Sequence, residues 1–157
     1  DIVAGEIQLG GLRHTDSKIA ARFQRSQVQT GDIVMSIRAT VGTTALVPPE
    51  LDGANLTQGT ARIAPGKRTE TNFLLEHLRS QATQRWIERQ VKGATFREIT
   101  LGRLRQLPIH LPPIELQREF TSRCSASTAV RTRSQESLEQ LDVAFGSLQQ
   151  RAFRGDL

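Results

Sequence analysis

The feature that most constrains this chain is the stretch that follows Pro112 and Pro113. From there to Gly146 the sequence contains neither proline nor glycine. Proline is tolerated in the first turn of a helix, because its missing N–H would have no partner there. We therefore predict one long helix over residues 112–157. About 40 residues of helix would span about 60 Å, which is more than the width of a small domain, so this helix needs another helix beside it.

A heptad repeat gives the predicted helix a seam. The seam that starts at Phe120 is apolar at both ends and polar in the middle, at Ser127, Arg131 and Ser134. Polar interior positions favour one register or partner over many. The seam residues expected to pair with a second helix are Phe120, Cys124, Leu138, Leu141, Phe145 and Leu148. The alternative is an amphipathic helix folded back on its own domain, and the length argues against it.

The first 66 residues are rich in strand signals. Residues 2–9 alternate weakly between apolar and polar, and residues 33–37 form a β-rich run bounded by turn residues. Residues 43–47 complete a hairpin that Pro48 and Pro49 must end, because proline cannot donate to a ladder. A further short strand is expected over residues 59–64.

The next part of the chain is mixed. A stripe of Leu75, Leu78, Ala82 and Trp86 predicts a helix over 71–91 that Gly93 ends as a left-handed cap. Thr100 is expected to cap a short helical turn through residue 105, and residues 107–111 resemble an edge strand, where Pro108 is tolerated. The fold class is α+β. We expect a β-rich domain with a packed helix over residues 1–111 and a long coiled-coil-type helix over residues 112–157.

Charge points to an anionic partner. The net charge is +5, and the basic residues are 18 Arg and 3 Lys, with the excess in the first two-thirds of the chain. Guanidinium groups suit phosphates and guanine edges. The single cysteine, Cys124, excludes an intrachain disulfide, and no apolar stretch is long enough to span a bilayer, so we expect a cytoplasmic protein. The sequence begins at Asp1 within a strand-like pattern, which indicates a fragment or processed chain.

No pattern of catalytic residues is visible. The three histidines, His14, His77 and His110, have no metal-ligand spacing, and Gly66-Lys67 is followed by Arg68 instead of the hydroxyl of a phosphate loop. Residues 111–114, LPPI, lack the amide and the aromatic ring of an amino-methyltransferase motif. We expect neither enzymatic activity nor a cofactor or metal.

Several stretches resemble the specificity subunits of type I restriction-modification enzymes. Residues 31–42, GDIVMSIRATVG, and 54–63, ANLTQGTARI, look like central strands of that family's target-recognition domain. The family's connection from the recognition domain into a conserved helix is similar to three further stretches, residues 93–95, 99–101 and 107–117, of which the last reads LPIHLPPIELQ. Residues 148–157, LQQRAFRGDL, look like the family's C-terminus.

The resemblance implies a DNA-binding subunit that directs methyltransferase (M) and restriction (R) subunits to a bipartite site. In the family, two recognition domains separated by two long antiparallel helices each read half of the site, and other subunits cleave and methylate. The chain corresponds to the C-terminal half of such a subunit. It is then a fragment, or a natural half that forms a homodimer through its helix and reads a palindromic bipartite site.

We expect the DNA face to lie on loops beside the strand ends. Arg38 suits bidentate contact with guanine, and Lys92 suits a phosphate as a point charge. Asn55 and Gln58 have the paired amide atoms that read adenine. The residues expected to contact double-stranded DNA are Arg38, Asn55, Gln58, Lys92, Thr95 and Arg97.

Two alternatives stay open from the sequence. One is a regulatory or decoy half subunit, which would occupy methyltransferase partners without directing productive restriction. The other is a helix-mediated scaffold without DNA binding, supported by the balance of 6 basic and 6 acidic groups over residues 112–157. The scaffold predicts no salt-dependent binding to DNA.

Overall fold

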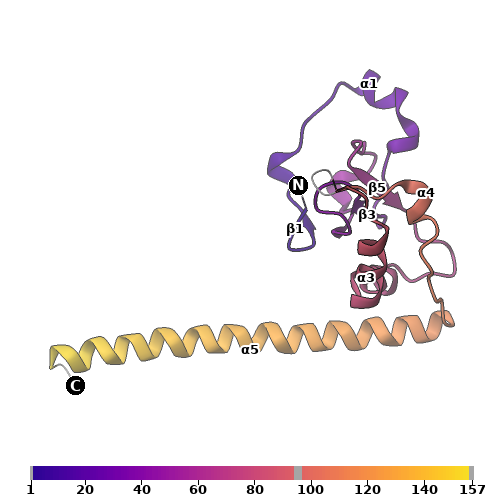
Figure 1. The fold of residues 1–157 in the computed structure, drawn as a ribbon. Coiled ribbons are helices and arrows are strands. Elements are labelled where there is room, and N and C mark those ends of the chain that lie inside the picture. Colours follow the sequence, from indigo (N-terminus) through magenta and orange to yellow (C-terminus); the bar gives the residue numbers. More distant parts are fainter. Residues whose placement is uncertain (1, 94–96, 156–157) are drawn as a thin grey trace. The chain divides into compact units, whose positions relative to one another are not determined.

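The computed structural model describes residues 2–93 and 97–155. The chain divides into two compact units, Asp1–Arg118 and Glu119–Leu157, called unit 1 and unit 2 below. Most of the strands and α-helices are labelled in Figure 1. In chain order they are β1 (Ile2–Val3), β2 (Glu6–Ile7), α1 (Ser17–Arg22), β3 (Ile33–Ser36), β4 (Thr44–Leu46), β5 (Thr60–Ile63), α2 (Thr71–Arg79), α3 (Gln81–Gln90), α4 (Leu101–Leu104) and α5 (Ile114–Arg154). This mixture of helices and antiparallel strands confirms the α+β class.

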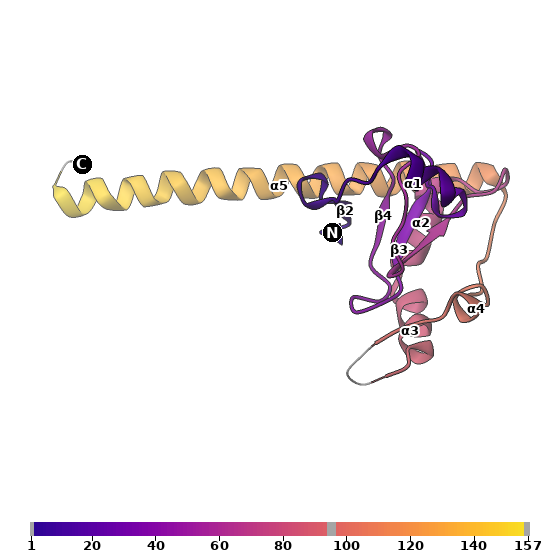
Figure 2. The ribbon, with the colours of Figure 1, turned by 90° about the horizontal axis from the view of Figure 1, so that it is seen from above.

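Unit 1 is built around an antiparallel sheet of three strands in the order β4-β3-β5. Figure 2 shows β3 and β4 side by side. Val34 pairs with Ala45 of β4 and with Arg62 of β5, which confirms the predicted hairpin and third strand. The turn from β3 into β4 requires Gly42, because its φ is +93° and an added Cβ would lie 2.6 Å from the Oε1 atom of Gln84.

Both faces of this sheet are covered. Ile33 and Met35 belong to an apolar cluster with residues of α2 and α3. Val34 points to the opposite face and packs with Val28 and Val47, against which the β1–β2 hairpin also lies. A strand buried on both faces has apolar residues at consecutive positions, which explains the strong signal of Ile33, Val34 and Met35.

The single helix predicted over 71–91 is wrong, because α2 and α3 meet at Ser80. Ser80 has an extended ψ of 146°, and its hydroxyl accepts a hydrogen bond from the Thr83 N–H at 3.3 Å, which caps α3. Serine competes with helix-interior hydrogen bonds and favours caps. The predicted glycine cap is also wrong: the C-cap of α3 is Val91, and Gly93, with φ +88°, lies beyond it.

The edge strand predicted over 107–111 does not form, since these residues belong to neither sheet of the described chain. Pro108 has no N–H to donate to a ladder, and Pro112 and Pro113 follow directly. The neighbouring prediction is confirmed: Thr100 caps α4 by accepting a hydrogen bond from the Arg103 N–H at 3.3 Å.

The N-terminal segment is less strand-rich than expected. The weak alternation over residues 2–9 is a short hairpin that turns at Ala4 and Gly5, both with positive φ. The helix α1 was not expected, because its 6 residues are too few to show a helical period. Its cap is Asp16, whose side chain accepts from the Lys18 N–H at 2.7 Å.

Helix α5 starts two residues later than expected, after Pro113, whose carbonyl accepts from the N–H groups of Leu116 and Gln117. Gln117, in unit 1, is fully buried. Its Oε1 atom accepts from the Glu70 N–H at 2.9 Å, and its Nε2 atom donates to the carbonyls of Arg68 and Pro112 at 3.0 and 2.7 Å. The helix continues through Gly146 to Arg154.

Candidate functional site

Three of the expected DNA-contacting residues gather just beyond β3. The segment around Glu98 pairs with the chain on both sides: Lys92 and Glu98 exchange backbone hydrogen bonds of 3.0 and 3.1 Å, and the Ala39 N–H donates to the Arg97 carbonyl at 3.0 Å. The adjacent Ile99 N–H donates to the Ile37 carbonyl. Arg38, Lys92 and Arg97, which are far apart in the sequence, therefore lie on neighbouring backbone segments.

Gln58 lies close to this group. The next residue, Gly59, accepts a hydrogen bond at its carbonyl from the Ile37 N–H at 2.9 Å, and a Cβ added to Gly59 would lie 4.0 Å from the Cβ of Arg38. Gln58 is exposed. We call Arg38, Gln58, Lys92 and Arg97 the loop cluster.

Carboxylates hold two members of the loop cluster. Arg38 pairs with Glu98 at 3.2 Å, with the two side chains 51% and 41% exposed, and Arg97 pairs with Glu88. Exposed ion pairs of this kind contribute between about 0 and 1 kcal/mol. A phosphate or a base edge can therefore replace either carboxylate at small cost.

A polar pocket of about 350 Å³ opens beside Lys92. Its lining combines two basic side chains, one carboxylate and neutral polar groups, from Gln90, Lys92, Gly93, Glu98, Thr100 and Arg103. Arg103 lies on α4, so this short helix adds a further guanidinium next to the loop cluster.

One other expected contact residue, Asn55, is not part of this group. Asn55 uses its amide nitrogen inside unit 1, donating to the Phe23 carbonyl at 2.9 Å and to the Ser26 hydroxyl at 3.1 Å. It would have to give up these bonds to pair both amide atoms with adenine. Thr95 lies outside the described residues.

A second cavity, of about 500 Å³, carries basic residues that the sequence did not single out. Arg25, Arg62 and Arg105 lie along it, and its other lining residues are aliphatic or carry hydroxyl groups. We call this cavity the arginine groove. The only sequence signal for it was the excess of arginine, because its three arginines come from segments about 40 residues apart that only the fold brings together.

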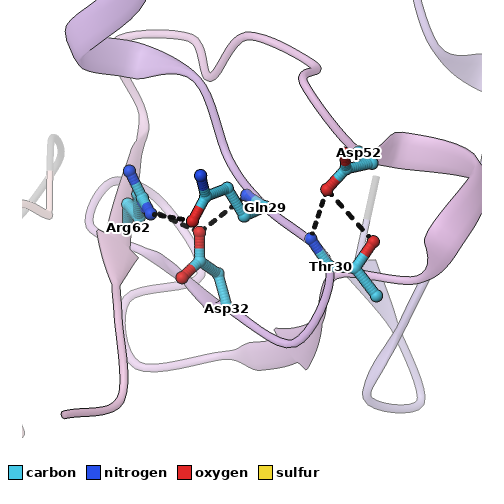
Figure 3. A network of polar contacts seen from close by, with 5 residues as sticks. All are labelled: Gln29, Thr30, Asp32, Asp52 and Arg62. Carbon is cyan, nitrogen blue, oxygen red and sulfur yellow. Dashed lines mark hydrogen bonds and ion pairs between the residues drawn. The ribbon is translucent and has the colours of Figure 1, made fainter. Parts of the chain in front are cut away.

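A buried carboxylate orients Arg62, as Figure 3 shows. The Nε of Arg62 donates to Asp32 at 2.5 Å, and the side chain of Asp32 is only 6% exposed. Asp32 also accepts from the Gln29 N–H at 2.7 Å, while the Oε1 atom of Gln29 accepts from the Nη2 of Arg62 at 3.4 Å. On the adjoining turn, Asp52 accepts two hydrogen bonds from Thr30.

The predicted seam residues in unit 2 are accessible. Their exposed fractions are 45% for Phe120, 52% for Leu138, 67% for Leu141, 62% for Phe145 and 49% for Leu148, and Cys124 is half-buried. Leu138, Leu141, Phe145 and Leu148 follow a spacing of three and four residues, which places them on one face of α5.

Within the part of the chain that the structure describes, no three His, Cys, Asp or Glu side chains are grouped so that they could hold a metal ion. No described helix is long and apolar enough to cross a membrane.

Comparison with known proteins identifies the family. The model of the type I restriction modification DNA specificity domain matches residues 7–140, and the chain belongs to this family. This confirms the resemblance seen in the sequence. The match extends over most of unit 1 and into α5.

Particular relatives agree with this membership. The chain is 28% identical to the type I restriction enzyme EcoBI specificity subunit of Escherichia coli over 162 aligned residues, which cover 100% of this chain and 34% of that protein. The HsdS subunit from Thermoanaerobacter tengcongensis has a similar structure, with a TM-score of 0.58 and 26% identity over 68% of this chain and 28% of that one.

A second solved chain, from work on complex assembly and conformational transition of the type I R-M system, gives a TM-score of 0.63 and 29% identity. That similarity covers 83% of this chain and 32% of the other. This chain therefore spans about a third of the length of the relatives it matches.

Proposed function

We propose that unit 1 binds double-stranded DNA through the loop cluster and supplies one half of the specificity of a type I restriction-modification complex. The observation that carries this proposal is the gathering of Arg38, Lys92 and Arg97 around the backbone of Glu98. Guanidinium and ammonium groups are the side chains that bind phosphates and guanine edges. Membership of the DNA specificity family supports the same partner.

Within this proposal the members of the loop cluster differ in role. Arg38 reads a guanine edge through its planar fork after leaving Glu98, and Lys92 and Arg97 bind phosphates. Gln58, exposed beside Arg38, reads an adenine. Asn55 is a weaker candidate because of its internal hydrogen bonds, and Thr95 stays a candidate as the sequence predicts it.

The experiment compares Arg38→Ala with Lys92→Ala in binding to cognate and random duplexes over a range of salt concentrations. Lys92→Ala should weaken binding to both duplexes and lower the salt slope by about one, since one phosphate contact is lost. Arg38→Ala should cost roughly 1–3 kcal/mol on the cognate duplex alone. Equal weakening on random DNA by both variants would contradict the division of roles, and binding that does not depend on salt would contradict DNA recognition.

We further propose that α5 pairs with a second helix through Phe120, Cys124, Leu138, Leu141, Phe145 and Leu148. In a homodimer of this chain the partner is a second α5, and the paired helices hold two identical recognition units. Support comes from the four aliphatic and aromatic side chains on one exposed face between Leu138 and Leu148. Burying such side chains contributes about 1.5–3 kcal/mol each.

Light scattering tests the pairing. The protein should have the mass of a dimer, and replacing Leu141 and Phe145 by glutamate should give a monomer, because a paired seam cannot solvate the two charges. Replacing the exposed Arg133 and Arg151 by glutamate is the control for added acidic charge. A wild-type chain that stays monomeric at every concentration would contradict the homodimer.

The complex then directs methyltransferase and restriction subunits to the DNA, and cleavage and methylation take place on those subunits. In this proposal the chain itself is not an enzyme and needs no cofactor. The site of action is the cytoplasm, where the DNA and the other subunits are located.

A further inference from the structure

Three arginines line the arginine groove, and one of them, Arg62, is paired with the carboxylate of Asp32. Arg25 comes from the turn before Val28, Arg62 from β5 and Arg105 from the residue that follows α4. The lining residues include no Asp or Glu. Arg25 and Arg105 add positive charge that no lining carboxylate neutralises, so the groove favours an anionic occupant.

One of the three arginines is held in advance of any binding. Asp32 and Gln29 accept from the Nε and Nη2 of Arg62, and a guanidinium carries more N–H donors than these contacts use. The burial of Asp32 makes its pairing with Arg62 costly to break. Arg62, which lines the groove, is therefore held with unused donors, and an anion that binds it has a lower entropic cost than at an unrestrained arginine.

The groove adjoins the loop cluster across α4. Thr100 and Arg103 line the pocket beside Lys92, whereas Leu101, Leu104 and Arg105 line the groove. The two cavities thus lie along the same four-residue helix and its ends. A ligand that runs past the loop cluster would reach the groove next.

We propose that the arginine groove holds a stretch of the DNA phosphodiester backbone, with Arg25, Arg62 and Arg105 as phosphate contacts and Asp32 as the residue that positions Arg62. This inference rests on the proposed DNA binding and extends the bound surface beyond the loop cluster. Exposed Leu101 and Ile109 at the groove would contact sugars or thymine methyl groups. A protein partner is the alternative occupant, and the continuity with the loop cluster favours DNA.

The test uses the complete chain, a random-sequence duplex and anisotropy measured over a range of salt concentrations. The variant Arg25→Gln with Arg105→Gln leaves the Asp32–Arg62 pair intact. Its matched control is Arg85→Gln with Arg89→Gln, which removes the same charge from exposed positions of α3 that line neither cavity. The groove variant should lower the salt slope by about two and the control should leave it unchanged, because the slope falls by about 0.9 for each lost phosphate contact.

Gln29→Ala examines the positioning of Arg62 without exposing the buried carboxylate. Gln29 is itself exposed, so the free energy of unfolding should change little. DNA affinity should fall while the salt slope stays the same, because Arg62 keeps its charge and loses only a contact that orients its guanidinium group. Arg62→Lys should also retain charge and lose affinity, since an ammonium cannot reproduce the fork that contacts Asp32 and phosphate together.

Three results would overturn the inference. Equal loss of slope in the groove variant and the α3 control would show a general charge effect. Unchanged DNA binding in the groove variant, together with lost binding to the purified methyltransferase subunit, would make the groove a protein interface. If the wild-type chain bound no DNA even at low salt, the result would contradict the proposed DNA binding of unit 1 and the inference with it. If the wild-type chain bound DNA and the groove variant bound it equally well, only the proposed role of the arginine groove would be contradicted.

Discussion

At the scale of single residues, one backbone conformation beside the loop cluster is unfavourable. Ala39, next to Arg38, has a φ of +57° and donates its N–H to the Arg97 carbonyl. The left-handed region costs a residue with a Cβ about 1–2 kcal/mol. The strain lies at the turn that separates Arg38 from β4, where the direction of the arginine is set.

Ala39→Gly should therefore stabilise unit 1. We expect the free energy of unfolding to rise by about 1 kcal/mol, because glycine adopts positive φ without a steric penalty and loses part of that gain to backbone entropy. Urea unfolding measures the change. Ala45→Gly, at a buried β4 position with ordinary φ, is the control and should destabilise. A loss of stability in both variants would show that Ala39 is not strained.

Part of the candidate site could be predicted from the sequence and part could not. Arg38 and Lys92 could be predicted because each follows a recognisable strand or helix, where binding residues concentrate. Arg25, Arg62 and Arg105 could not, since they come from three separate segments that only the fold brings to one cavity. The amide of Asn55 looked available in the sequence, but its partners, Phe23 and Ser26, lie about 30 residues away.

At the scale of elements, local chemistry decided which predictions held. The strand β3 was predictable because both of its faces are covered and its first three residues are apolar, and α4 was predictable from its threonine cap. The break between α2 and α3 was not, because the apolar stripe continues across Ser80 while the serine side chain caps the second helix. Residues 107–111 have strand composition but no available ladder in the described chain.

The first turn of α5 depends on Gln117. Gln117→Leu should lower the free energy of unfolding of unit 1 by roughly 1–3 kcal/mol, because leucine fills the space and leaves the Glu70 N–H and the Arg68 carbonyl without this partner. Urea unfolding again gives the measurement. Arg118→Ala, at the exposed neighbouring position, should change stability by less than about 0.5 kcal/mol. A neutral Gln117→Leu would mean that these hydrogen bonds contribute nothing to folding.

At the scale of the whole molecule, the family places one DNA specificity domain in a chain that spans about a third of its relatives. Two identical recognition units joined by paired α5 helices would read two identical half-sites in opposite directions. The preferred DNA sequence therefore tests both proposals at once. The sequence of one half-site tests DNA reading by the loop cluster, and the repetition of that half-site tests the pairing of two α5 helices.

The most direct measurement is selection of bound duplexes from a random DNA pool by the purified chain at moderate salt. We expect enrichment of one short sequence, present as an inverted repeat with a fixed spacer, and loss of that enrichment in Arg38→Ala. Enrichment of a single half-site would retain DNA recognition and reject the homodimer. A pool that stays random after repeated rounds would contradict the central claim that unit 1 reads DNA sequence.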